Sequence, residues 1–244
     1  MTRICPIHGE YESEDIEMFG MSVSIGCPEC IKKKEEEARA EEEKISKERE
    51  IERLKSMNIE PMYYDATIDT FIAETEEQDR AKKAVKHLIR TRTGKMVILG
   101  KNGTGKTHLG VAMVRVLGGA IYTMYEISTR IRATYTKQAK EDESDVTSEL
   151  SSLPMLVIDE VGKTKGSDAE LSWLSFVFDK RHSRKLPTAF LSNKHPKKQC
   201  KVQGGCVDCI ENYIGDDIMS RCNEDGIMVI LNGDDYRLKK RAGS

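Results

Sequence analysis

A short apolar run, MVILG (96–100), leads directly into GKNGTGKT (100–107), and the apolar helical pattern HLGVAMVRVL follows it. Gly, four residues and then Gly-Lys-Thr is the P-loop pattern, here between the strand and the helix that it requires. Glycines let backbone N–H groups turn toward phosphate oxygens, and the N-terminus of the helix favours the same anion. We therefore expect an α/β fold that binds ATP through Gly100, Lys101, Asn102, Gly103, Thr104, Gly105, Lys106, Thr107 and His108.

Two acidic residues, Asp159 and Glu160, end a second apolar run, MLVIDEV (155–161). The carboxyl ends of parallel strands are where α/β sheets place ligand chemistry. We expect Lys106 to neutralise the β- and γ-phosphates, and Thr107 and Asp159 to hold Mg²⁺. Glu160 would polarise the attacking water as a general base. The alternative is an acidic pair that merely closes a strand.

A third apolar run, TAFLSN (188–193), ends in a polar amide, Asn193, which can sense the γ-phosphate and orient water. Continuous apolar runs of this kind suit parallel strands that are buried on both faces. We predict strands at 96–100, 120–125, 155–161, 188–193 and 227–232, and an amphipathic helix at 74–92. Together they predict a parallel sheet flanked by helices, in a domain spanning 59–244. The polar stretch 139–152 reads as a loop or a frayed helix.

The first thirty residues carry two ligand pairs, Cys5-Pro-Ile-His8 and Cys27-Pro-Glu-Cys30. Pairs of this spacing form tight knuckles that point two ligands each at one Zn²⁺. We expect a zinc-ribbon-like module at 1–30, whose folding energy the metal supplies. Free thiols or a redox pair are the alternatives. Residues 31–58 follow with nine basic and nine acidic side chains, which predicts a solvated linker helix.

A second cysteine group, near the C-terminus, has irregular spacing, and His195 lies close to it in sequence. Four thiols can hold a second zinc, and ordinary reduced thiols are the alternative. The candidate ligands of this second site are Cys200, Cys206, Cys209 and Cys222.

The formal net charge is −2, so any nucleic-acid contact must come from a local patch. Residues 121–140 interleave tyrosines with basic residues, a pattern suited to stacking bases and tracking phosphates. An amphipathic helix with a solvated basic edge explains the same pattern. The N-terminus lacks the apolar core of a secretory signal, and no run reaches membrane-spanning length, so we expect a cytoplasmic protein without membrane contact. The patch comprises Tyr122, Tyr125, Tyr135, Arg130, Arg132, Lys137 and Lys140.

The ordered set GKNGTGKT, VIDEVG, DKRH, LPTAFLSN, DIMSR and DDYR resembles the DnaC/IstB-like AAA+ ATPases over nearly all of residues 60–241. The resemblance implies an ASCE-type AAA+ domain without a C-terminal helical lid. It also implies a homo-oligomer in which Arg221 acts in trans as an arginine finger, with Arg237 as a sensor arginine. Arg181, in DKRH, is the competing finger candidate.

The same resemblance implies a helicase loader that binds single-stranded DNA and a replicative helicase. In loaders of this family the N-terminal extension contacts the helicase, and here a cysteine module replaces the helical extension of the best-known loader. The alternatives are a transposition helper of the same family, a P-loop phosphotransferase, and a zinc-containing adaptor with ATP as a structural ligand. Adjacent acids at 159–160 favour water over a small-molecule acceptor.

Overall fold

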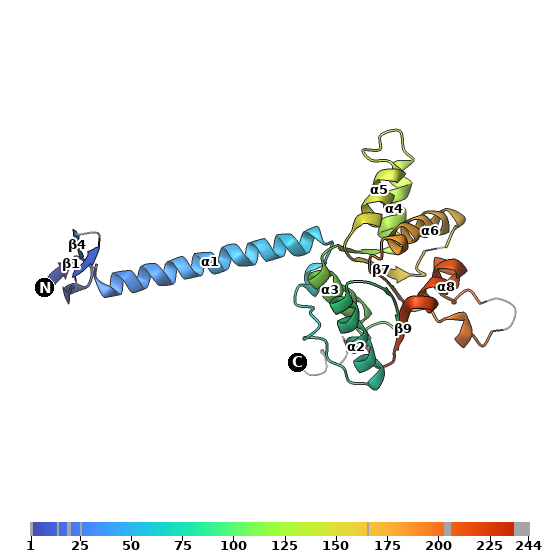
Figure 1. The fold of residues 1–244 in the computed structure, drawn as a ribbon, viewed down its shortest axis with the longest axis horizontal. Helices are drawn as coiled ribbons and strands as arrows, with labels where there is room; N and C mark the ends of the chain where they lie inside the picture. Colours follow the sequence, from blue (N-terminus) through green and yellow to red (C-terminus); the bar gives the residue numbers. More distant parts are fainter. Residues whose placement is uncertain are drawn as a thin grey trace. The chain divides into compact units, whose positions relative to one another are not determined.

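The computed structural model describes residues 2–13, 15–18, 21–24, 26–164, 166–202 and 206–236, and it divides into two compact units, Met1–Arg53 and Leu54–Ser244 (Figure 1). The first unit begins with two antiparallel hairpins. None of the helices among the described residues is both long enough and apolar enough to span a membrane. The hairpins are β1 (Thr2–Cys5) with β2 (Gly9–Glu12), and β3 (Asp15–Met18) with β4 (Met21–Ser24).

The charged segment forms one helix, α1 (Pro28–Ser56), which begins three residues before the predicted linker. Proline at the first helical position costs no hydrogen bond, so Pro28 is a natural start. Ion pairs four residues apart line the helix, such as Glu43 with Lys47 at 2.6 Å. Its one buried side chain is Leu54, which packs in the core of the second unit.

The second unit is built on a five-stranded parallel sheet in the order β6-β7-β8-β5-β9. The strand after the P-loop helix, β6, is therefore not the neighbour of the P-loop strand, because β7 and β8 lie between β6 and β5. The predicted sheet and its five strands are confirmed, with boundaries shifted by one or two residues. The strands are β5 (Lys95–Gly100), β6 (Ala120–Thr123), β7 (Leu156–Val161), β8 (Thr188–Ser192) and β9 (Gly226–Leu231).

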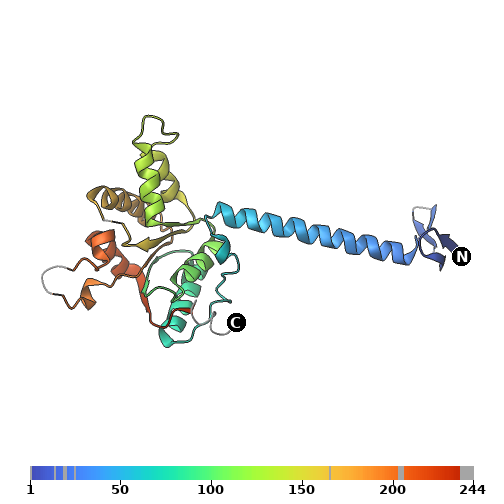
Figure 2. The same ribbon diagram turned by 180° about the vertical axis from the view of Figure 1, so that it is seen from behind.

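Helices cover both faces of this sheet, as Figures 1 and 2 show. Alternation along β5 explains the two cores: Met96 and Ile98 pack with α2 and α3, whereas Val97 and Leu99 pack with the other helices. The predicted helix–sheet–helix sandwich is confirmed. On the first face lie α2 (Glu76–Thr91) and α3 (Lys106–Leu117); on the second lie α4 (Met124–Thr134), α5 (Glu143–Ser152), α6 (Asp168–Ser183), α7 (Glu211–Ile214) and α8 (Asp216–Asp225).

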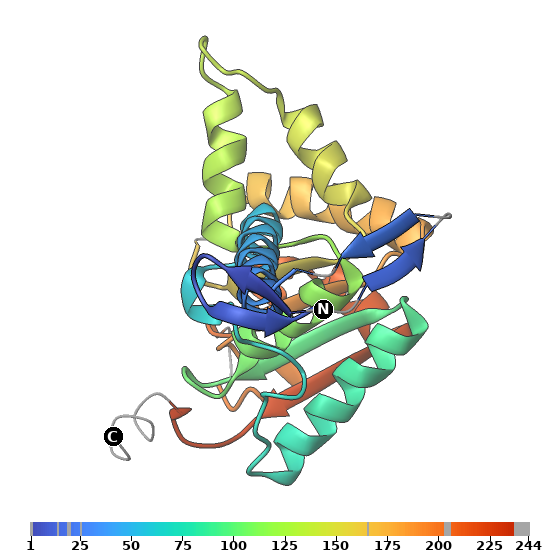
Figure 3. The ribbon, with the colours of Figure 1, turned by 90° about the vertical axis from the view of Figure 1, so that its left-hand side faces the viewer.

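Two local predictions need correction. The strand predicted at 120–125 ends at Thr123, because Thr123 and Glu126 form a capping box that starts α4. The stretch 139–152, expected as a loop or frayed helix, contains the regular helix α5, capped by Asp142 and anchored by buried Val146. The two helices lie side by side, joined by the loop 135–142 (Figure 3).

Candidate functional site

The P-loop joins the carboxyl end of β5 to the first turn of α3. Gly103 and Gly105 have φ of 74° and 94°, in the left-handed region that favours glycine. A Cβ at Gly105 would also lie 2.6 Å from the Phe71 ring. Lys106 Nζ donates to the carbonyl oxygens of Gly100 and Lys101, each at 2.8 Å, so its side chain folds back along the loop. The loop thus has the backbone that a phosphate cradle requires.

The first turn of α3 is tied to the end of β7 by a hydrogen bond from Thr107 Oγ1 to Asp159 Oδ2, at 2.6 Å. Asp159 is buried, and burial raises the pKa of its carboxyl group, while hydrogen bonds from Thr107 and from the Glu160 N–H act in the opposite direction. Two oxygen atoms on one octahedral Mg²⁺ lie about 2.9 Å apart, given bonds of about 2.0–2.1 Å. The threonine and aspartate oxygens therefore fit a shared magnesium ion.

Glu160 has an unusual backbone for a strand residue, with φ of 57°. The β7–β8 register shifts between Ile158 and Val161, so the irregularity falls on the two acids. Consecutive residues of a regular strand point to opposite faces of the sheet, but here both Asp159 and Glu160 line one cavity. Glu160 pairs there with Lys163. A left-handed non-glycine residue costs about 1–2 kcal/mol, and such strain clusters at functional sites.

The end of β8 lies between the P-loop strand and the acidic strand. Ser192 is the register partner of both Leu99 on β5 and Val161 on β7, and its hydroxyl donates to the Val161 carbonyl at 2.5 Å. Asn193, the next residue, is exposed and lines the same cavity as the acids. Three strand ends thus bring the P-loop, the acidic pair and Asn193 together.

The cavity has a volume of about 960 Å³ and is lined by residues 102–108 with both acids and Asn193. Gly100 and Lys101 line an adjoining cavity of about 260 Å³, which also reaches Asn193. A third wall comes from the segment before α2, including Tyr63, Thr70 and Phe71. Sequence reasoning missed this wall, although the apolar residues of DATIDTF were a signal for it.

His108 fixes that wall against the P-loop helix. Its Nε2 lies 2.8 Å from the Thr67 carbonyl oxygen, and its ring meets the Phe71 ring edge-on at 5.5 Å. Burial lowers the pKa of His108, which favours the neutral imidazole. A neutral ring beside an aromatic ring gives the cavity an apolar end suited to a nucleoside base.

The three candidate arginines differ sharply. Arg221, on α8, is partly exposed and pairs with Asp179 of α6; it is absent from the described lining of its own chain's cavity. Arg181 is fully buried and donates to the carbonyl oxygens of Leu150, Leu153 and Pro187 and to the Thr188 hydroxyl. A guanidinium held in the core cannot reach a neighbouring subunit, so the competing assignment of Arg181 as finger is wrong. Arg237 lies outside the described residues.

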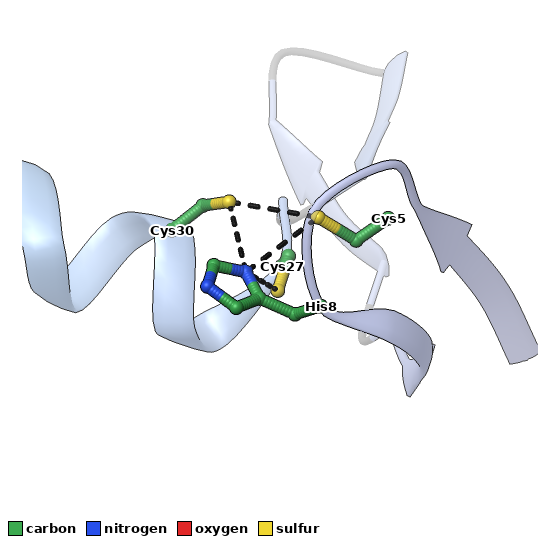
Figure 4. A group of neighbouring side chains, drawn as sticks. All are labelled: Cys5, His8, Cys27 and Cys30. Carbon is green, nitrogen blue, oxygen red and sulfur yellow. Dashed lines mark hydrogen bonds between the residues drawn. The ribbon is translucent and has the colours of Figure 1, made fainter.

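In the N-terminal unit, Cys5, His8, Cys27 and Cys30 converge, as Figure 4 shows. His8 Nδ1 lies 3.7, 3.5 and 3.3 Å from the three sulfur atoms, and the Cys5 and Cys30 sulfurs are 3.6 Å apart. In a tetrahedral zinc site of three thiolates and one imidazole, ligand atoms lie about 3.5–3.8 Å apart. The donor set therefore fits a structural zinc ion.

Electrostatics at this cluster also suit a cation. The N–H of Ile7 is the largest of the contributions that lower the pKa of Cys5 to about 6, whereas its hydrogen bond with Cys5 raises the pKa of Cys30 to about 11. Thiolates that gather without a cation oppose one another's ionisation, and a divalent metal removes that conflict. Glu29 lies 3.5 Å from His8 Nε2, on the side of the ring away from the sulfurs, as a partner that orients the ligand.

The C-terminal cysteine group differs from the expected set. His195, Cys200, Cys206 and Cys209 place their ligand atoms within 4.8 Å of one another, and Cys222 is not among them. Cys222 lies on α8 with its side chain buried in the apolar core, and burial raises its pKa to about 12. The expectation that Cys222 completes the group is wrong, because its helix turns the thiol inward to the sheet.

The basic and aromatic patch is only partly free for nucleic acid. Arg130 contacts Glu141 and Glu149, each at 2.6 Å, and so joins α4 to α5 and to the loop before it. Tyr122 donates to Glu149 and so joins β6 to α5. Tyr125 and Tyr135 remain exposed, with the Arg132 guanidinium 6.0 Å from the Tyr125 ring centre. The remaining exposed basic residues of the patch are Arg132, Lys137 and Lys140.

Comparison with known proteins gives a consistent picture. The family model described as IstB-like ATP binding protein matches residues 32–244. The replicative helicase loader DnaC of Escherichia coli K12 is 27% identical over 188 residues, covering 73% of this chain and 72% of the loader. DnaC of Buchnera aphidicola from Acyrthosiphon pisum is 27% identical over 182 residues, covering 70% and 74%.

Among solved structures, a DnaC helicase loader superposes with a TM-score of 0.58 at 19% identity, covering 71% of this chain and all of the other. AMPPCP-bound DnaA of Aquifex aeolicus gives 0.57 at 21% identity, covering 75% of this chain and 55% of the other. At these identities the likeness establishes the AAA+ fold alone.

Proposed function

Because the chain belongs to the IstB-like ATP-binding protein family, we propose that it is a Mg²⁺-dependent ATPase that loads a replicative helicase onto single-stranded DNA. The observation that carries the ATPase proposal is the single cavity that collects Lys106, Asp159, Glu160 and Asn193. The helicase proposal is supported by the DnaC relatives, which are named as replicative helicase loaders.

Each site residue has a role in this proposal. The backbone of residues 100–105 and the Lys106 ammonium bind the phosphates, and Thr107 and Asp159 hold the metal. Mg²⁺ held by these two side chains would supply positive charge to the β- and γ-phosphates. Glu160 accepts a proton from the attacking water, and Asn193 orients that water toward the γ-phosphate. The apolar end near Phe71 holds the base.

We further propose that Arg221 completes the site of a neighbouring subunit. Its position on α8, partly exposed and outside its own cavity, suits an arginine that acts in trans. A planar, permanently charged guanidinium matches the spread charge of a phosphoryl group in transfer, and such fingers contribute about 10³–10⁵ in rate. Hydrolysis then depends on assembly of a homo-oligomer. Arg237 stays a proposed sensor arginine.

We assign the contacts with the helicase and with DNA to different parts of the chain. We assign helicase contact to residues 1–30, which lie outside the family match, and treat 31–58 as a linker and 59–244 as the ATPase domain. Zn²⁺ bound by Cys5, His8, Cys27 and Cys30 would stabilise the contact module. The exposed Tyr125, Arg132 and Tyr135 supply stacking and charge for single-stranded DNA.

A transposition helper ATPase is the second candidate, because the matching family model is named for IstB-like proteins. Such a helper would favour duplex DNA and a transposase. The loader assignment predicts preference for single-stranded DNA and capture of a hexameric helicase. The two candidates therefore separate on DNA form and on the captured partner.

The test uses the tagged full-length Glu160→Gln chain as bait for the host's replicative helicase. We expect ATP-dependent capture of the helicase, and transfer of the helicase to circular single-stranded DNA by the wild-type protein. A Cys5→Ser/Cys30→Ser variant should lose capture while it still binds ATP. Capture of a transposase in place of the helicase, with tighter binding to duplex DNA, would contradict the loader assignment.

A further inference from the structure

We propose that His195, Cys200, Cys206 and Cys209 bind a second structural Zn²⁺, which fixes the connection between the Asn193 strand end and the helix that carries Arg221. The metal site stands on geometry alone, and the coupling to Asn193 rests on the proposed function.

The ligand atoms have the spacing of a tetrahedral site. His195 Nε2 lies 3.6 Å from the Cys206 sulfur and 3.7 Å from the Cys209 sulfur. These values fall within the range of about 3.5–3.8 Å for neighbouring ligands around one zinc. Three thiolates and one imidazole form a closed, soft donor set that selects zinc over magnesium or calcium. Four protein ligands fill the tetrahedron and leave no open position for chemistry.

A second observation is a shared backbone feature of the two cysteine clusters. The N–H of Asp208 points at the Cys206 sulfur, at 3.4 Å, two residues along the chain. In the N-terminal cluster the N–H of Ile7 points at the Cys5 sulfur in the same way, at 3.5 Å. An N–H that faces a sulfur stabilises the thiolate, the form that binds metal. Both C-x₂ segments therefore have the turn of a zinc knuckle.

The backbone around the cluster is held independently of any metal, so the site is built rather than incidental. His195 and Cys209 form a parallel β-bridge. The His195 N–H donates to the Asp208 carbonyl at 3.1 Å, and the Ile210 N–H donates to the His195 carbonyl at 2.9 Å. The Asn212 side chain adds a bond to the Cys206 carbonyl at 2.6 Å.

The cluster is directly continuous with the nucleotide site. His195 comes two residues after Asn193, and the residue between them, Lys194, contacts Asp208 at 2.7 Å and donates its N–H to Ser192 Oγ at 3.1 Å. His195 and Asn193 both line the cavity that adjoins the P-loop. On the other side, α7 begins two residues after Cys209 and leads to α8. A metal at this point fixes both ends of the segment.

Zinc content of the full-length protein, purified without chelators, tests the metal site. We expect two equivalents in the wild type and one in Cys5→Ser/Cys30→Ser. Cys206→Ser/Cys209→Ser and His195→Ala should each lower the content from two to one, whereas Cys222→Ser should keep two, since it lies in the apolar core. One equivalent of zinc in the wild type together with none in Cys5→Ser/Cys30→Ser would overturn the proposal. Neither of these two proteins carries a substitution in the second cluster. Loss of zinc in Cys222→Ser with retention in His195→Ala would overturn the ligand set.

The coupling has its own readout. If the metal positions Asn193, Cys206→Ser/Cys209→Ser should lower kcat for ATP about as much as Asn193→Ala does, with KM nearly unchanged, because Lys106 and the loop still bind nucleotide. An unchanged kcat in a variant that has lost this zinc would overturn the coupling to Asn193. The zinc content would still test the metal site separately. Absence of ATPase activity in the wild type would instead overturn the proposed function.

Discussion

Thr107 and Asp159, far apart in sequence, are joined by a 2.6 Å hydrogen bond between the first turn of α3 and the end of β7. This contact unites the two halves of the nucleotide site. It depends on the strand order, which places β8 between β5 and β7 and brings all three carboxyl ends to one edge. The roles proposed for the neighbouring residues can each be separated by substitution.

Lys106→Ala should weaken ATP binding without unfolding the protein. The ammonium donates to two loop carbonyls and would exchange them for phosphate oxygens, and charge-assisted bonds are worth about 1.5–3 kcal/mol, or roughly 10–100-fold in Kd. Titration with a fluorescent ATP analogue measures the change. Lys86→Ala, at an exposed position on α2, is the matched control and should bind as the wild type does. Equal affinity in both variants would contradict the P-loop assignment.

How far the sequence predicted this site depends on the kind of information each part needs. The P-loop, Asp159, Glu160 and Asn193 were predictable because local patterns place each at a strand end. The wall that includes Phe71 was not, since it depends on how the segment before α2 folds across α3, although His108, which holds that segment, was among the predicted residues. The backbone of Glu160 was also beyond reach, because a β-bulge leaves no pattern in MLVIDEV.

The roles of the arginines and cysteines also depend on tertiary packing. Short motifs pointed to Arg221 as the finger and left Arg181 as a competing candidate, and the burial of Arg181 excludes it from that role. The spacing of Cys222 gave no sign that α8 turns it into the core, while His195 was close to the other thiols in sequence from the start. Tertiary packing, which no local spacing encodes, decides both cases.

Protonation of Asp159 should weaken Mg²⁺ binding at acidic pH. Burial raises its pKa, so the carboxylate that Mg²⁺ needs is lost, as pH falls, at a higher pH than for an ordinary aspartate. Protons and metal compete for one group, and Mg²⁺ affinity in the presence of ATP should decline through that raised pKa. Asp159→Asn should bind Mg²⁺ weakly at every pH and should not show this decline of affinity as pH falls. A wild-type affinity that stays flat down to the ordinary aspartate range would contradict this.

The raised pKa of Asp159 also determines how this residue changes the free energy of unfolding with pH. Because the folded-state pKa of Asp159 is raised, the folded protein holds this proton more readily than the unfolded chain. Its contribution to the free energy of unfolding is therefore unfavourable above the folded pKa and is relieved as pH falls through it. Thermal unfolding at neutral pH checks the sign: Asp159→Asn, without nucleotide, should melt no lower than the wild type.

Arg221 can be tested by mixing two inactive proteins. Arg221→Ala keeps its own Lys106, and Lys106→Ala keeps its own Arg221, so only a mixed interface has both groups. An equal mixture should regain about a quarter of the wild-type rate of phosphate release, because one interface in four is complete by random assembly. Asp179→Ala, which removes only the ion-pair partner within the subunit, serves as the control and should stay active. Failure of the mixture to exceed either variant alone would contradict action in trans.

Arg181→Met should destabilise the fold, and the protein that remains folded should still hydrolyse ATP. The change removes the donors for three carbonyl oxygens and the Thr188 hydroxyl. Each unsatisfied buried group costs about 1–3 kcal/mol, so we expect a loss of about 4 kcal/mol or more in total. Urea unfolding measures the loss. Arg184→Met, exposed on the same segment, should change stability by less than about 0.5 kcal/mol. Similar losses in the two variants would argue against a structural role for Arg181.

The most direct test of the central claim is phosphate release by Glu160→Gln under single-turnover conditions, with ATP binding measured on the same sample. The amide retains the shape of the side chain but cannot take a proton from water. We predict ATP affinity within about threefold of the wild type and a hydrolysis rate lower by about 10²–10⁴. A variant that releases phosphate at the wild-type rate would contradict the claim that this cavity hydrolyses ATP through Glu160.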